Sequence, residues 1–110
     1  GDFINTAFVE KALSEIDCVA DVYVYGLAVT DGLAPGEKDI VAAVVATDRN
    51  SFNATEVLRS CTEKLYRKSV PDFIQVLDEI PKTSSEKPQE RFLTEAFQAQ
   101  PDDVYAASVL

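Results

Sequence analysis

Hydrophobic positions change period several times along the first half of the chain, and each change predicts a different element. Residues 6–16 carry an apolar stripe at helical spacing. Segments 19–29 and 40–46 are rich in β-branched, tyrosyl and alanyl residues, which predicts two strands. The second of these segments is apolar at consecutive positions, so we expect both of its faces to be covered. Gly32 and Gly36 between the segments are typical of the turn in a long hairpin.

The second half of the chain predicts a helix, a strand and a final helix. Asn53 and Glu56 form a capping box that begins an amphipathic helix. Residues 73–80 predict a third strand, which Pro81 ends. Pro88 suits the first turn of a last helix, which breaks after residue 99.

This order of elements predicts an α+β fold, a small three-stranded, mainly antiparallel sheet flanked by helices. The 110 residues fit one domain, and 46% hydrophobic with 26% charged residues is the balance of a globular protein. We expect this domain to span residues 1–99, with residues 100–110 as a mobile tail.

Composition narrows the classes of function. A net charge of −9 argues against a nucleic-acid binder, which needs clustered Lys and Arg. The absence of histidine excludes a His-based catalytic triad or metal site within this chain. Cys18 and Cys61 lack the spacing of a metal or redox pair and are expected to be reduced core residues.

No apolar run is long enough for a membrane span, and we expect a cytoplasmic protein. Because the chain opens on Gly1 and contains no methionine, we expect it to be a processed chain or an excised piece of a longer protein.

The polar loop from Pro81 to Lys87 holds the one candidate for chemistry. Lys87 stands just before a predicted helix N-terminus, where a cation is disfavoured by about 0.3–1 kcal/mol. From the residues alone, a solvated loop lysine is the simplest interpretation. We expect residues 84–87 of this loop to be more mobile than the three predicted strands, because nothing apolar in them can be buried.

Several short motifs occur one after another along the chain. They are Gly1 with Val9-Glu10, Val19-Ala-Asp21-Val22-Tyr-Val24-Tyr-Gly26, Gly36-Glu37, Ala42-Ala43-Val44-Val45, Lys68-Ser-Val70-Pro71, and Ile80-Pro81 with Thr83, Ser85, Lys87, Arg91 and Leu93. In this order and spacing they resemble the C-terminal domain of the adenylate-forming (AMP-binding) superfamily, of the acyl-CoA synthetase type that includes long-chain fatty-acid and carnitine-CoA ligases. The sequence differs from the family pattern at Phe3, at Glu86 in place of a glycine, and at Glu90 in place of an arginine.

The resemblance implies a role in an AMP-forming carboxylate:CoA ligase. Lys87 matches the catalytic lysine of ATP-dependent acyl-adenylate formation, and Gly1 matches the glycine of a strand that turns toward CoA in the thioester step. ATP, Mg²⁺ and CoA are then expected in the full-length enzyme, with none of them bound to this domain alone. The implied partners are a missing large N-terminal domain and a carboxylic acid substrate, and the isolated domain is expected to be inactive.

Two alternatives stay open. The chain could be a fragment of an amino-acid adenylation domain that serves a carrier protein. It could also be a non-catalytic α+β module that binds a partner through its acidic surface.

Overall fold

The computed structural model describes residues 6–65 and 69–109. The helices are α1 (Thr6–Ser14), α2 (Ala54–Lys64) and α3 (Glu90–Ala99), and the strands are β1 (Val19–Leu27), β2 (Asp39–Ala46), β3 (Phe73–Leu77) and β4 (Val104–Ala106). Short 3-10 helices, η2 (Pro101–Asp103) and η3 (Ala107–Val109), precede and follow β4. The predicted α+β class is confirmed.

The sheet has four strands in the order β1-β2-β3-β4, so the predicted count of three is wrong. β1 and β4 lie antiparallel to their neighbours, whereas β2 and β3 are parallel because α2 connects them across the sheet. β4 comes from the segment that we expected to be a tail. Its three residues are too few to show an alternating pattern, which is why the sequence did not predict it.

Arg49 joins η2, the 3-10 helix before β4, to the segment that follows β3. The guanidinium of Arg49 lies 2.8 Å from a carboxylate oxygen of Asp78 and 2.8 Å from one of Asp103. Arg49 follows β2 and Asp78 follows β3, so the C-terminal segment is tied to both central strands. The mobility of residues 100–110 stays a prediction.

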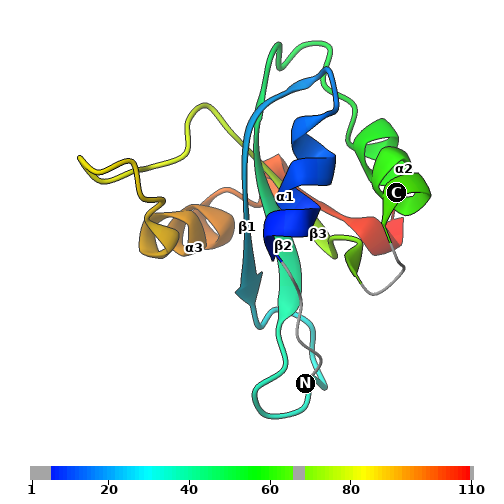
Figure 1. Ribbon diagram of the computed structural model, residues 1–110. Coiled ribbons are helices and arrows are strands. Elements are labelled where there is room, and N and C mark those ends of the chain that lie inside the picture. Colours follow the sequence, from blue (N-terminus) through cyan, green and yellow to red (C-terminus); the bar gives the residue numbers. More distant parts are fainter. Residues whose placement is uncertain (1–5, 66–68, 110) are drawn as a thin grey trace.

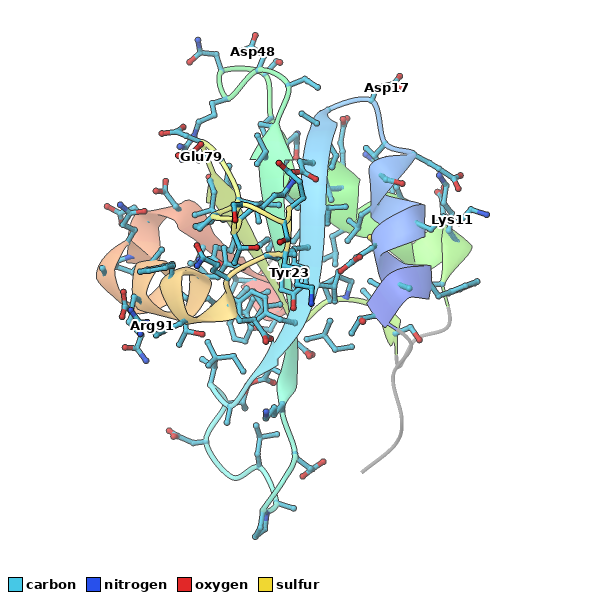
Figure 2. The ribbon with its side chains drawn as sticks, turned by 60° about the vertical axis from the view of Figure 1, so that its left-hand side comes forward. Lys11, Asp17, Tyr23, Asp48, Glu79 and Arg91 are labelled. Carbon is cyan, nitrogen blue, oxygen red and sulfur yellow. The ribbon has the colours of Figure 1, made fainter. Side chains whose placement is uncertain are left out.

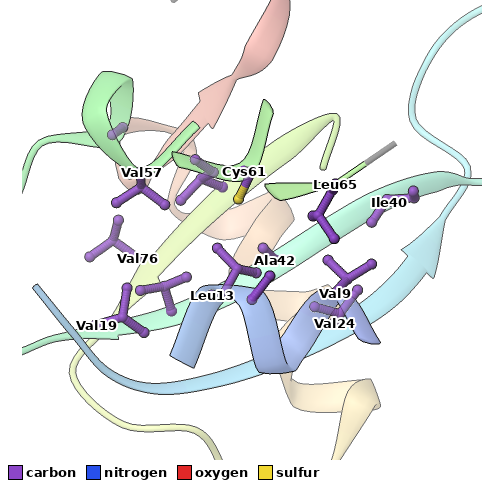
Figure 3. Packing of buried hydrophobic residues seen from close by; sticks show 14 residues of the cluster. Val9, Leu13, Val19, Val24, Ile40, Ala42, Val57, Cys61, Leu65 and Val76 are labelled. Atoms are coloured by element: carbon purple, nitrogen blue, oxygen red, sulfur yellow. The ribbon is translucent and has the colours of Figure 1, made fainter. Parts of the chain in front are cut away.

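Helices cover both faces of the sheet, with α1 and α2 on one side and α3 on the other (Figure 1). The larger apolar cluster lies under α1 and α2, where Val9 and Leu13 of α1 meet Ala42 of β2 and Val57 of α2 (Figure 3). Residues 39–44 of β2 are all buried, so the prediction that both of its faces are covered is confirmed. Alternate residues of the strands therefore face different helices.

Local signals explain where α2 begins and how the cysteines lie. The side chain of Asn53 accepts a hydrogen bond from the backbone N–H of Glu56 (3.2 Å), which confirms the predicted cap. Cys18 and Cys61 are both free thiols; Cys18 is half-buried, and Cys61 is buried on the inner face of α2. Burial raises the pKa of the Cys61 thiol to about 11.

No helix within the described part of the chain is both long and apolar enough to cross a bilayer.

Candidate functional site

The segment Lys82–Pro88 is a short hairpin that precedes α3, and we refer to it as the Lys82–Pro88 hairpin. Lys82 and Pro88 pair as an antiparallel bridge. Inside that pair, the backbone N–H of Thr83 donates to the carbonyl of Lys87 (2.8 Å), and the N–H of Glu86 donates to the carbonyl of Thr83 (2.9 Å). These hydrogen bonds argue against the mobile loop that its polar composition predicts.

Glu86 adopts a backbone conformation that favours glycine. Its φ is +65°, in the left-handed region, and it is the one non-glycine residue with positive φ in the described part of the chain. A left-handed residue that closes a turn of this kind is the usual place for glycine in hairpins with a bulge. For another L-residue this conformation costs roughly 1–2 kcal/mol. The departure from the family pattern at this position therefore adds backbone strain.

Lys87 follows Glu86, and its side chain is exposed. Its backbone N–H donates to the hydroxyl of Thr83 (3.2 Å), which fixes the main chain beside the turn. Among the residues that the structure describes, no carboxylate lies within ion-pair distance of the Lys87 ammonium, and Glu86 is no exception. The hairpin thus holds the backbone of Lys87 and leaves its charge available.

Lys82 at the base of the same hairpin is held differently. Its Nζ lies 2.9 Å from Oδ2 of Asp21 on β1, and this hydrogen bond raises the pKa of Lys82. The two residues border an open hollow of about 580 Å³, which Glu86 and Phe92 also line. The ion pair connects the hairpin to the edge strand of the sheet.

The backbone also joins the hairpin to α3. The N–H of Gln89, the N-cap residue of α3, donates to the carbonyl of Pro81 (2.8 Å) just before the hairpin. Arg91 in the first turn of α3 stacks over the ring of Phe92 and lies 4.0 Å from the carboxylate of Glu95. The hairpin and α3 therefore form one unit on one side of the sheet.

A buried hydrogen-bond chain beneath α3 was not predicted from the sequence. The hydroxyl of Tyr25 donates to Oε1 of Gln75 (2.6 Å), and Nε2 of Gln75 donates to the carbonyl of Leu93 (2.9 Å). The signal was present as a glutamine at an inward position of the apolar strand Phe73–Leu77. Gly1, the other residue predicted to belong to the site, lies outside the described residues.

The family follows from a match over most of the chain. A family model described as the AMP-binding enzyme C-terminal domain matches residues 9–87. The chain belongs to this family. The matched range includes the larger core, the strands β1 to β3 and the hairpin up to Lys87, so the resemblance inferred from short motifs is confirmed at the level of the family.

Solved structures of CoA synthetases share the fold of this AMP-binding C-terminal domain. A Mycobacterium tuberculosis fatty acyl CoA synthetase matches with a TM-score of 0.77 and 24% identity, over 90% of this chain and 19% of that one. The o-succinylbenzoate CoA synthetase MenE from Bacillus subtilis, in complex with the acyl-adenylate intermediate OSB-AMP, matches with a TM-score of 0.72 and 28% identity, over 84% and 18%. ATP-bound MatB from Rhodopseudomonas palustris matches with a TM-score of 0.73 and 19% identity, over 86% and 18%.

The chain spans less than a fifth of the length of these three structures. At 24% and 19% identity the likeness to the first and third is one of fold. A comparison with curated protein sequences gives no significant match.

Proposed function

We propose that this chain is the C-terminal domain of an AMP-forming carboxylate:CoA ligase, of the fatty-acyl or carnitine-CoA type, and that Lys87 serves its adenylate-forming step. The observation that carries the proposal is the exposed Lys87 ammonium, held on a hydrogen-bonded hairpin inside the matched family range. The structurally similar CoA synthetase MenE, which was solved in complex with an acyl-adenylate, supports the same reaction class.

The proposed first step joins the carboxylic acid to AMP. A carboxylate oxygen attacks the α-phosphorus of ATP, the bond between the α- and β-phosphates breaks, and pyrophosphate leaves. Negative charge gathers on the α-phosphate and the attacking carboxylate in the transition state. An ammonium on a long stem is a compact charge that can bridge the two groups, so Lys87 contributes electrostatic stabilisation rather than proton transfer.

In the proposed second step, the thiol sulfur of CoA attacks the acyl carbon and AMP leaves, with the thiol proton passing to solvent. Lys87 is not needed for this step, and Gly1 is the residue of this chain that we assign to the CoA side. ATP with its Mg²⁺ and CoA bind in the full-length enzyme, to which a large N-terminal domain contributes the acyl pocket. Within residues 6–65 and 69–109 no cluster of three or more His, Cys, Asp or Glu side chains could hold a metal ion.

The test separates the two steps in the full-length enzyme. Lys87→Ala should lower the rate of acid-dependent pyrophosphate exchange by roughly 10²–10³-fold, the scale for losing one preorganised electrostatic donor. Thioester formation from a supplied acyl-adenylate should change far less. Lys11→Ala is the matched control, because Lys11 lies on the outer side of α1, on the opposite side of the sheet from α3 (Figure 2). Equal loss in both steps, or no loss in either, would contradict the proposed role of Lys87.

A further inference from the structure

Gln75 is an unusual residue for its position. It lies in the middle of β3 and is 1% exposed, and Asp39 is the other polar side chain buried in the described part of the chain. Burying an amide without hydrogen-bond partners costs about 1–3 kcal/mol in proteins. A strand of this composition would tolerate an aliphatic residue there, so the amide calls for an explanation beyond stability.

The amide is satisfied from both sides. The Tyr25 hydroxyl on β1 donates to Oε1 (2.6 Å), and Nε2 donates to the Leu93 carbonyl on α3 (2.9 Å). Burial and the nearby Glu90 carboxylate raise the pKa of Tyr25, so its hydroxyl stays protonated and remains a donor. The orientation of the amide is therefore fixed, because its oxygen must meet the hydroxyl and its nitrogen must meet the carbonyl.

Strand register brings these residues together across β2. Ala43 of β2 lies between Tyr23 of β1 and Gln75 of β3 in the same row of the sheet. Ala43 has no side chain beyond its Cβ and is fully buried, so the long side chain of Tyr25, two residues along β1 and on the same face, can reach over β2 to Gln75. The rings of Tyr23 and Tyr25 stack with centroids 6.1 Å apart, and Tyr23 lies on the α3 side of β1 (Figure 2).

Few apolar contacts hold α3 on the sheet. Leu93 is its one buried residue, and Phe97 adds an edge-to-face contact with Phe73 at 5.5 Å between ring centroids. Hydrophobic contact is not directional, so these contacts alone leave α3 free to slide or rotate. A hydrogen bond from Gln75 to the Leu93 carbonyl selects one position along the helix axis.

We propose that Tyr25 and Gln75 are positioning residues that hold α3, and with it the Lys82–Pro88 hairpin, in the orientation that acyl-adenylate formation requires. The inference rests on the proposed function of Lys87. The path runs from the sheet through Gln75 to Leu93, along α3 to its N-cap residue Gln89, and from the N–H of Gln89 to the carbonyl of Pro81 at the start of the hairpin. A small displacement of α3 therefore displaces the Lys87 ammonium.

The experiment replaces the polar pair by apolar residues of similar shape in the full-length enzyme, Tyr25→Phe together with Gln75→Leu. Removing both partners of the Tyr25–Gln75 hydrogen bond is close to neutral for stability. The Leu93 carbonyl loses the Gln75 donor but lies inside α3, where the helical N–H four residues later satisfies it, so the melting temperature should stay near that of the wild type. The adenylation rate should fall about tenfold, within the range expected for an ångström-scale misplacement. The loss should be in kcat, with KM for the acid and ATP unchanged and with thioester formation from a supplied acyl-adenylate retained.

Lys87→Ala in the same assay distinguishes the two proposals. If the Tyr25 and Gln75 side chains act through Lys87, adding their substitutions to Lys87→Ala should cause no further loss of adenylation, a strong departure from additivity. If Lys87→Ala is itself harmless, the proposed function fails. If Lys87→Ala is damaging while the folded double variant adenylates at the wild-type rate, the positioning inference alone is overturned.

A single variant, assayed at a temperature at which circular dichroism shows it to be folded, keeps the test valid if the double variant does not fold. Tyr25→Phe removes one hydroxyl and leaves the bond from Gln75 to Leu93 in place. A lower adenylation rate with unchanged thioester formation supports the inference. Equal loss in the two steps, or no loss, overturns it.

Discussion

The two sides of the sheet are held together by different physics. Among the described residues, fourteen buried ones form one apolar cluster around α1 and α2, whereas the cluster around α3 has four. The side with the smaller cluster has the buried glutamine, the stacked tyrosines and the Lys82–Pro88 hairpin. On the side of α1 and α2, burial of apolar residues supplies stability, but it is not directional. On the side of α3, directional hydrogen bonds fix the orientation of the helix. The candidate residue, Lys87, lies on the α3 side, where hydrogen bonds fix orientation and apolar burial is smaller.

The largest expected effect on stability is the loss of a core side chain under α1. Leu13 is fully buried in the larger cluster. Leu13→Ala should lower the free energy of unfolding by about 2–5 kcal/mol, through lost burial and the cavity left behind. Chemical denaturation of the 110-residue chain measures this change. Val109→Ala is the control, because Val109 is 80% exposed and its loss should cost under about 0.5 kcal/mol.

The second effect is a loss of stability at alkaline pH that arises on the same side. The Cys61 thiol has an ordinary pKa of 9.0, and burial raises it to about 11 in the folded protein. The unfolded chain therefore ionises first, so stability is complete below pH 9 and declines as the pH rises toward 11. The decline from this group should be about 2–3 kcal/mol by pH 11. Denaturation at a series of pH values measures it.

Cys61→Val isolates that contribution, since valine is apolar and of similar size. Its stability curve should be flatter between pH 9 and 11 than that of the wild type. The remaining slope should come from other groups with raised pKa values, including Tyr25. An unchanged slope would show that Cys61 is not protected from ionisation.

On the α3 side, removing the Tyr25 hydroxyl alone should destabilise the protein more than removing the hydroxyl and the Gln75 amide together. Tyr25→Phe leaves Oε1 of Gln75 buried without a donor, which should cost about 1–3 kcal/mol. Adding Gln75→Leu should restore much of that loss, because no amide then remains buried under α3. Thermal denaturation of the two variants measures the difference. Additive losses would contradict the view that the amide is present for orientation.

The two sides also differ in how much of them could be predicted from the sequence. Helical and strand periods predicted the apolar stripe of residues 6–16, which includes the buried Leu13, and the doubly covered strand over residues 40–46, because burial of apolar residues follows a simple repeat. The cap at Asn53 was predicted because its partner is three residues away. Local patterns of this kind describe most of the α1 and α2 side.

The α3 side depends on contacts between distant residues. The bond from Tyr25 to Gln75 spans 50 positions, and the bond from Gln75 to Leu93 spans 18. No periodic signal marks such pairs, since each depends on strand order and register. Lys87 was found through its motif, while the hairpin that holds it could not be predicted, because Glu86 is not a residue type that indicates a left-handed turn.

The smallest expected effect tests that turn. The left-handed conformation of Glu86 is strained, whereas glycine adopts positive φ without the clash of a Cβ atom. Glu86→Gly should relieve roughly 1–2 kcal/mol of backbone strain, and the greater freedom of glycine in the unfolded chain should cancel part of the gain. We expect a net stabilisation of about 0.5–1 kcal/mol, seen as a rise of a few degrees in melting temperature.

Ser84→Gly is the matched control for this variant, because it places a glycine in the same turn at a residue whose φ is not positive. There the substitution relieves no strain and adds only unfolded-state freedom, so stability should fall by about 0.5–1 kcal/mol. Opposite signs for the two variants would establish that strain is concentrated at Glu86. A loss of stability in both would contradict the left-handed conformation. The Lys87 backbone should keep its bonds to Thr83 in Glu86→Gly, so adenylation by the full-length enzyme should persist while the melting temperature rises.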